Sequence, residues 1–261
     1  SALAAAAPAT EAEIIQALLV HPEYPDQDKR ERLAALGELQ DVPSERTVPA
    51  LRMALRDPIA EVAYAAVEAL ETLHEVDSLV ELLQDERLSV HAACALGRIG
   101  DVAAVPPLVD VWERRAGDPL ARVSAAQALA DIGGAGARPT MLKLLAHQES
   151  HVRRIGLRAL QKDGSEEAVA GIRALLRKDW ELRREAIEAL GEMRASSAFD
   201  DLVEQLGSRE DWVTGDAAEA LGMIGDARAL DSLSAHLDKL DPDDPDRDRF
   251  VHAIRKLSGS K

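Results

Sequence analysis

The feature that most constrains this chain is a repeat of about 31 residues built around the dipeptide Ala-Leu. Seven similar strings carry it, and their leucines are 34, 26, 33, 31, 30 and 31 residues apart. An eighth, weaker copy ends at Leu257. A fixed period of this length predicts an array of similar units, each packed against its neighbours in sequence. The seven repeat leucines are Leu36, Leu70, Leu96, Leu129, Leu160, Leu190 and Leu221.

Each unit is predicted to be a pair of helices. Apolar residues lie at helical spacing between the Ala-Leu strings, as at Val105, Leu108 and Trp112, and turn residues such as Asp57-Pro58 and Gly133-Gly134 separate the helices. Ala and Leu make up 31% of the chain, 46 and 35 residues, which is typical of helical arrays rather than sheets. First helices are expected near residues 10–20, 46–56, 76–84, 103–115, 136–146, 165–177, 197–207 and 227–239. Second helices are expected near residues 28–40, 59–73, 86–99, 119–132, 149–161, 180–193, 210–224 and 248–257.

The predicted fold is an all-α solenoid of about eight stacked helix pairs, because one pair buries too little surface to be stable alone. We expect a single repeat domain over residues 10–257. The first ten residues lack Met and a basic segment, so residues 1–9 are interpreted as a disordered linker or a processed end. Residues 258–261 are expected to form a short tail.

Charge and composition exclude several classes of function. The chain has 31 basic and 47 acidic residues, a net charge of −16, which repels phosphate backbones and predicts no nucleic-acid partner. No stretch approaches the roughly 18 apolar residues that a membrane span needs, so no membrane partner is expected. The single cysteine, Cys94, excludes an internal disulfide framework and a multi-thiolate metal site. A cytoplasmic protein is the prediction.

The repeat resembles a known family. Second helices begin with Val-Arg or Leu-Arg, at Val152-Arg153 and Leu182-Arg183, and continue with paired small residues such as Ala125-Ala126, then Ala-Leu-Gly and Ile-Gly. This pattern resembles HEAT repeats, and the short form with "ALGRIGD" is similar to the phycobilisome-lyase (PBS lyase) type. The resemblance covers about residues 10–257 and implies a superhelix of the armadillo-like kind. Members of the family include scaffolds, lyases, a metal hydroxylase and a DNA glycosylase, so the resemblance does not define a function.

A helical wheel centred on the repeat leucine separates a core face from an open face. Positions eight, four and three before the leucine, and three after it, are predicted to be core. Positions six, five and two before it, and two after it, are predicted to be open. In HEAT-like proteins the second helices line the concave surface, so the open positions are where a partner would bind.

The open positions of the middle repeats are unexpectedly apolar. Tyr64, Val90, Cys94, Val123 and Ile155 lie where a solvated face would carry charged residues. We interpret them as the floor of a groove for a protein or peptide, with basic residues beside it. The alternative is that the wheel is shifted and these residues are core. The predicted binding residues are Tyr64, Val90, His91, Cys94, Arg98, Val123, Gln127, Arg154, Ile155 and Arg158.

Two further sets of residues recur at fixed positions. Arg122, Arg153 and Arg183 lie seven residues before the repeat leucine, and the resemblance implies a ladder in which turn carboxylates bond the arginine of the next unit. Trp180 and Trp212 lie 32 residues apart at the same turn of successive repeats. They are predicted to be aromatic plugs between units, with a binding ridge as the alternative.

No catalytic constellation is recognisable. The deoxyhypusine hydroxylase family places His-Glu pairs at the open positions, but here the only such dipeptide, His74-Glu75, falls in a predicted turn. His91 and Cys94 have the spacing of a nucleophile pair or of two metal ligands, yet a third group is not evident. We predict no catalytic residue, no metal and no cofactor. A non-catalytic protein is favoured; if the chain is an enzyme, lyase-like chromophore attachment is expected.

The predicted function is a protein–protein interaction scaffold that binds a protein or peptide segment on its concave face. The alternative is a phycobilin-lyase-like protein that holds a tetrapyrrole or another small ligand in the same groove, with Arg98, Arg154 and Arg158 facing its propionates. We expect a monomer or weak dimer, because the last predicted helix, with Phe250 and Ile254, is amphipathic enough to cap the array or to dimerise.

Overall fold

The computed structural model describes residues 10–18, 29–41, 45–114, 118–208 and 210–259. These residues form helices and turns without a strand, so the predicted all-α solenoid is confirmed. None of the helices in the described ranges is both long enough and apolar enough to span a bilayer. The predicted linker at 1–9 and the last two residues of the predicted tail at 258–261 lie outside the described residues.

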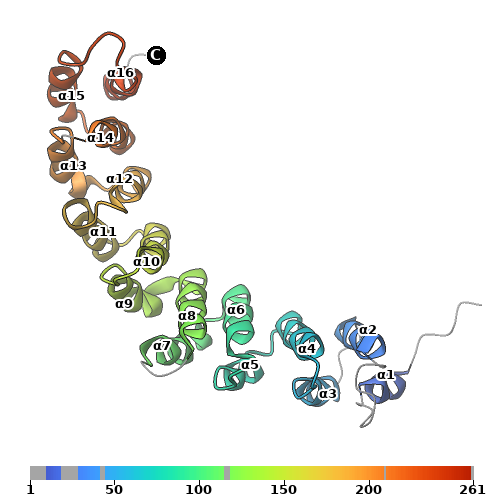
Figure 1. Cartoon of the computed structure of the whole chain (residues 1–261). Helices are drawn as coiled ribbons and strands as arrows, with labels where there is room; N and C mark the ends of the chain where they lie inside the picture. The colour runs from blue at the N-terminus through green and yellow to red at the C-terminus, as the bar shows by residue number, and fades with distance from the viewer. Residues whose placement is uncertain (1–9, 19–28, 42–44, 115–117, 209, 260–261) are drawn as a thin grey trace, which may run out of the picture. The chain divides into compact units, whose positions relative to one another are not determined.

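The chain forms two compact units, Ser1–Ile132 and Gly133–Lys261, and each is described by itself. The single repeat domain expected over residues 10–257 stays a prediction. In unit 1, α1 packs on α2, α3 on α4, α5 on α6 and α7 on α8, while α2, α4, α6 and α8 contact one another in sequence (Figure 1). The helices of unit 1 are α1 (Glu11–Ala17), α2 (Lys29–Asp41), α3 (Thr47–Ala54), α4 (Ala60–Thr72), α5 (Val76–Leu82), α6 (Ser89–Ile99), the 3₁₀ turn η1 (Val102–Ala104), α7 (Val105–Glu113) and α8 (Pro119–Ile132).

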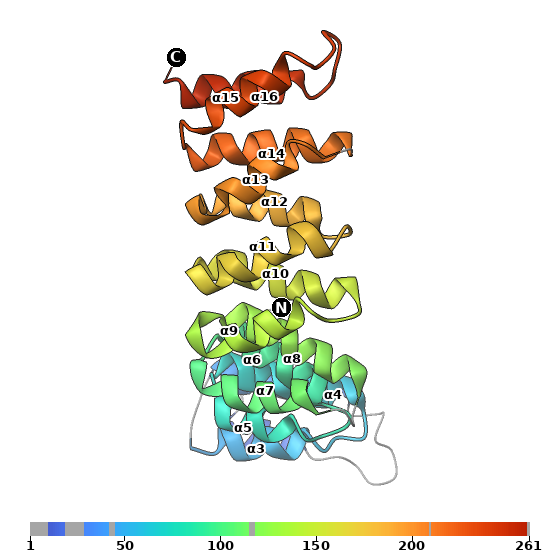
Figure 2. The ribbon, with the colours of Figure 1, turned by 90° about the vertical axis from the view of Figure 1, so that its left-hand side faces the viewer.

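Unit 2 repeats this arrangement in successive layers of helix pairs (Figure 2). Its second helices, α10, α12, α14 and α16, contact one another in sequence, and each packs on the first helix of its own pair. The helices of unit 2 are α9 (Gly134–Leu144), α10 (Ser150–Asp163), α11 (Glu166–Lys178), α12 (Arg183–Glu192), the 3₁₀ turn η2 (Ser196–Ala198), α13 (Phe199–Gln205), α14 (Asp211–Ile224), α15 (Ala229–Leu237) and α16 (Arg247–Leu257).

Burial follows the predicted wheel. In the third repeat, Leu88, Ala92, Ala93 and Leu96 are all buried, and the corresponding positions of the repeats centred on Leu70, Leu129, Leu160, Leu190 and Leu221 are buried too. The position three after the leucine is only half-buried, as at Ile99. The core phase of the wheel is therefore correct, and Tyr64, Val90, Cys94, Val123 and Ile155 are not core. The open-face prediction is wrong in the seventh repeat, where Gly215 and Asp216 are buried because α16 packs over them.

The Gly of the Ala-Leu-Gly string lets consecutive second helices approach closely. A Cβ atom added to Gly97 of α6 would lie 2.8 Å from the Cα of Ala128 in α8. The same contact recurs in unit 2 between Gly191 and Ala220, at 2.8 Å, and between Gly222 and Ala253, at 3.0 Å. Glycine is required here because any side chain would push the neighbouring backbone away.

The eighth copy has a different register from the prediction. Gly222 meets Ala253, so Ala253-Ile254 of α16 takes the place of Ala-Leu, and Leu257 lies three residues too late. Phe250, four residues before Ile254, is fully buried, as the wheel requires for that position. The error arose because Ile replaces Leu in the last copy.

Arginines seven residues before the repeat leucine bind the end of the first helix in their own pair. Arg122 donates to the Trp112 carbonyl at 3.1 Å, and Arg153 donates to the His147 carbonyl at 3.0 Å. Arg247 of the last copy donates likewise to the Leu237 carbonyl at 3.1 Å. The Trp112 and Leu237 carbonyls lie in the last turns of α7 and α15, where helix geometry leaves them without a partner, and His147 lies in the turn that follows α9. The arginine therefore recurs where the first helix ends and its turn begins.

The carboxylate ladder runs in the direction opposite to the prediction. Arg153 bonds Asp179 at 2.5 Å, and Arg183 bonds Glu210 at 3.1 Å, so each arginine pairs with the turn of the following repeat. Asp179 also accepts the N–H groups of Glu181 and Leu182, at 3.1 and 3.2 Å. The carboxylate thus caps the turn that leads into α12, and this turn delays the start of α12 to Arg183, later than predicted.

Replacing Gly97 by Ala should lower the free energy of unfolding by about 1–3 kcal/mol, because the added methyl collides with the backbone of α8. Gly37→Ala is the matched control, since Gly37 follows Leu36 in the same string but has no atom within 4 Å of its added Cβ. It should stabilise α2 by roughly 0.5–1 kcal/mol. Urea denaturation of both variants measures this, and equal effects would contradict the packing role of Gly97.

A buried ion pair gives a second stability prediction. Arg32 of α2 lies 2.7 Å from Asp57, and the two side chains are 0% and 1% exposed. Arg32→Met should cost about 3–5 kcal/mol, because it leaves a buried carboxylate without its cation. Adding Asp57→Asn should recover part of the loss, since Asn still accepts the Ile59 N–H. Thermal and urea unfolding test this; a double variant no more stable than the single one would refute the charge explanation.

Candidate functional site

Seven of the predicted binding residues lie on the outward surface of α4, α6 and α8 in unit 1. We call this surface the second-helix face of unit 1. Its apolar members are not core: Tyr64, Val90 and Val123 are half-buried, and Cys94 is exposed. They lie at the open positions because each second helix buries its other side against the first helices and its neighbours. The face comprises Tyr64, Val90, His91, Cys94, Arg98, Val123 and Gln127.

An aromatic pair connects α4 and α6 on this face. The rings of Tyr64 and His91 are stacked, with centroids 3.8 Å apart and planes 17° apart. The Nδ1 atom of His91 is buried and has no hydrogen-bond partner among the described residues. Cys94 follows one helical turn later, and the half-buried Val90 lies beside His91. The stacked rings therefore lie with Val90 and Cys94 on the same partly exposed surface.

The edge of the face is polar but internally paired. Arg98 forms a bidentate ion pair with Glu71, with both hydrogen bonds at 2.5 Å, and these bonds raise the pKa of Arg98. The Arg98 side chain is still 58% exposed. Gln127 donates to Asp131 at 2.9 Å. The edge therefore offers a partner polar groups that already bond one another, with Arg98 still exposed.

The remaining predicted residues lie on α10 in unit 2. Ile155 is half-buried, Arg158 is exposed, and Arg154 bonds Glu185 of α12 at 3.0 Å. Farther along, Asp216 of α14 accepts from Arg184 and Arg249 at 2.9 and 2.6 Å. Arginines on these second helices thus bind carboxylates of the neighbouring second helix. The basic strip expected around Arg154 is partly neutralised by this pairing.

A small hollow of about 280 Å³ lies on the same surface of unit 2, between α12, α14 and α16. Its walls are mainly acidic, with Glu188, Glu192 and Glu219 beside the ion-paired Asp216 and Arg249. Burial raises the pKa of Glu188, and the negative charge of Asp216 raises it further. Across the described ranges, no group of three or more His, Cys, Asp or Glu side chains is arranged to hold a metal ion.

The raised pKa of Glu188 gives a pH-dependent prediction. Its folded pKa lies above the unfolded value of 4.5, so stability falls as the pH rises from that value through the folded pKa. Glu188→Gln should therefore be more stable than the natural chain at pH 7, and the difference should vanish below about pH 4. Glu68→Gln, at the same position of α4, is the control. The test is the melting temperature of the natural chain and of both variants between about pH 4 and pH 7. A Glu188→Gln variant less stable than the natural chain at pH 7 would contradict the prediction.

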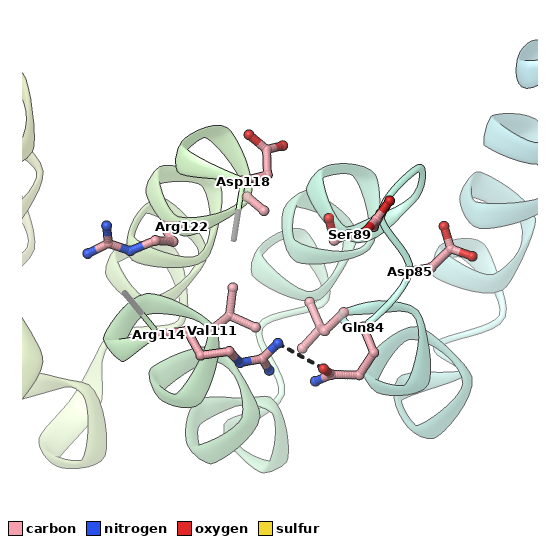
Figure 3. Close-up of a pocket in the computed structure, with 10 residues that line it drawn as sticks. Gln84, Asp85, Ser89, Val111, Arg114, Asp118 and Arg122 are labelled. Atoms are coloured by element: carbon pink, nitrogen blue, oxygen red, sulfur yellow. Dashed lines mark hydrogen bonds between the residues drawn. The ribbon is translucent and has the colours of Figure 1, made fainter. Parts of the chain in front are cut away.

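Two hollows that the sequence did not suggest lie at the edges where helix pairs turn. In unit 1, a hollow of about 480 Å³ lies between residues 83–89, which follow α5 and begin α6, and residues at the end of α7 and the start of α8 (Figure 3). Arg114 points across it and donates to Gln84 at 2.8 Å, while Asp85 and Asp118 lie at its rim (Figure 3). Turn residues carry no helical periodicity, so the wheel could not bring them together.

The second edge hollow, of about 500 Å³, lies in unit 2 between α9 and α11 and includes Trp180. Trp180 is 72% exposed, so its predicted role as a plug between units is wrong. Trp212, at the same turn of the next repeat, is half-buried and lies 5.0 Å below the Arg184 guanidinium. Sequence position alone therefore did not determine which way each tryptophan faces.

Comparison with known families identifies the class of protein. The model of HEAT repeats matches residues 112–181 and 175–255, more than half of the chain. The model of the PBS lyase HEAT-like repeat matches residues 90–111. The chain therefore belongs to the HEAT-repeat family, and the predicted resemblance to the PBS lyase type is confirmed.

Two solved structures, with TM-scores above 0.5, support the fold. YibA of Escherichia coli is 18% identical to this chain, with a TM-score of 0.57 over 97% of this chain and 98% of its own. An engineered protein is 22% identical, with a TM-score of 0.53 over 95% of this chain and 78% of its own. The complex of CpcE and CpcF of phycocyanin lyase from a Nostoc species is 20% identical, with a TM-score of 0.44 and 98% coverage of both chains. A comparison with curated protein sequences gives no match.

Proposed function

We propose that this chain is a non-catalytic repeat scaffold that binds a protein or peptide segment on the second-helix face of unit 1. The observation that carries the proposal is the apolar content of open positions, where Tyr64, Val90 and Val123 are half-buried rather than core. A solvated helix surface normally carries charged residues at such positions, and contiguous exposed apolar surface marks interaction sites.

The composition of the face suits a peptide. The stacked Tyr64 and His91 rings offer a rigid surface that loses little conformational entropy on binding. The Arg98–Glu71 pair and Gln127 provide hydrogen-bonding groups at the rim, and this arrangement of apolar centre and polar edge is typical of protein interfaces.

A tetrapyrrole is less well supported by the same contacts. Two of the arginines expected to face its propionates, Arg98 and Arg154, are already engaged by Glu71 and Glu185. A propionate would have to displace a carboxylate from each of them, which offsets the gain from a new ion pair. Incubation with a bilin should therefore give no shift in visible absorbance.

The proposal predicts a loss of binding without a loss of folding. Peptides selected by display on the immobilised natural chain should bind Val90→Glu/Val123→Glu at least about tenfold more weakly, because two charges replace the apolar floor. Ala34→Glu, at an exposed open position of α2, is the matched control and should bind normally. Calorimetry measures the affinities, and circular dichroism verifies helicity.

Two results would contradict the proposal. Selected peptides that bind the double variant as tightly as the natural chain would place binding elsewhere. Loss of helicity in the double variant would show that Val90 and Val123 are needed for packing. Ile155→Glu, on α10 of unit 2, tests separately whether binding also involves that unit.

A further inference from the structure

The edge cleft of unit 2 has an apolar floor. It lies between α9 and α11 and has a volume of about 500 Å³. Both helices are first helices of their pairs, so the cleft is separate from the second-helix surfaces described above. Ala146 and Ala174 are exposed, and Leu142 is half-buried, so the floor is open to a partner. The residues that form the floor are Leu142, Leu145, Ala146, Ala174, Leu175 and Trp180.

Trp180 is the unusual residue of this cleft. The other two tryptophans each lie under an arginine: Trp112 is 5.1 Å from the Arg122 guanidinium, and Trp212 is 5.0 Å from that of Arg184. Trp180 is 72% exposed, the largest fraction for any large apolar side chain in the described residues. Exposed tryptophan beside an apolar floor is the composition of an interface anchor, because its large ring gains much from burial.

The charge of the cleft favours an anionic partner. Asp179 is the single acidic residue among the described residues that line it. That carboxylate is occupied by Arg153 at 2.5 Å and by two backbone N–H groups of its own turn. Lys178 lines the cleft and is exposed. Glu181, next to Trp180, is likewise bound by Arg153 at 2.5 Å, so among the described residues of the cleft Lys178 supplies the positive charge that no ion pair engages.

We propose that the edge cleft of unit 2 binds a short peptide segment in which an apolar side chain stands next to a carboxylate. The apolar side chain packs on Leu142, Ala174 and Trp180. The carboxylate lies against the Lys178 ammonium, where it gains from charge complementarity that Asp179 does not cancel. This site is independent of the second-helix face of unit 1, because different helices form the two surfaces.

Three synthetic peptides with one Leu-Phe core, flanked by Glu, by Gln or by Lys, test the proposal on the full chain by calorimetry. The Glu-flanked peptide should bind at least about tenfold more tightly than the Lys-flanked one, and salt should weaken it. Trp180→Ala should reduce its affinity at least about tenfold. Lys178→Glu should reverse the order of the Glu and Lys peptides. The controls Val102→Ala, at a residue 71% exposed in unit 1, and Lys162→Glu should change neither result.

Equal affinities for the three peptides, or no binding at about millimolar concentration, would overturn the proposal. Analytical ultracentrifugation of the natural chain and of Trp180→Ala tests whether a second copy of this chain occupies the cleft instead. A dimer that becomes a monomer in this variant would show that another copy of the chain covers the cleft, and would also overturn it. Because Trp180 is exposed, helicity and melting temperature should stay unchanged.

Discussion

The close contact between consecutive second helices is the constraint on which the rest of each unit depends. Where Gly97 meets Ala128, the two backbones are so close that an added Cβ atom would lie 2.8 Å from the Ala128 Cα, and the same contact is found at Gly191 and at Gly222. Glycine and alanine occupy the contact between the two helices, so the larger side chains of each helix lie on either side of this contact. The leucines point into the core, and the open positions of neighbouring helices are brought side by side on the surface.

The turns are held by a second, polar set of interactions. Arg153 binds the His147 carbonyl in the turn after α9 and pairs with Asp179 of the next repeat, whose carboxylate caps the turn before α12. The Arg153–Asp179 ion pair thus joins the turn between α9 and α10 to the turn between α11 and α12. Since these bonds fix the turn backbone, the side chain beside the carboxylate is not needed to hold the turn. Trp180 occupies that place, and the edge cleft of unit 2 follows from it.

The two units differ in how their second-helix surfaces use charge. In unit 2, arginines and carboxylates of adjacent helices pair, as Arg184 does with Asp216, and the excess of acid collects around Glu188. In unit 1 the corresponding positions hold Tyr64, Val90 and Val123 instead. Apolar groups at half-buried positions gain free energy only when a partner covers them, which is why the interaction face is assigned to unit 1.

The sequence by itself determined the helix pairs, their approximate bounds and the phase of the core, because all three follow from the spacing of Ala and Leu within single helices. It also located the apolar open positions of the second helices. It failed where Ile254 replaced the repeat leucine, and it predicted the ladder of Arg153 in the wrong direction. Only the tertiary structure decided which carboxylate each arginine reaches, which way Trp180 and Trp212 face, and where hollows form between turns. These features depend on contacts between side chains that are about 30 residues apart in the sequence. The spacing of residues within one helix does not encode such contacts.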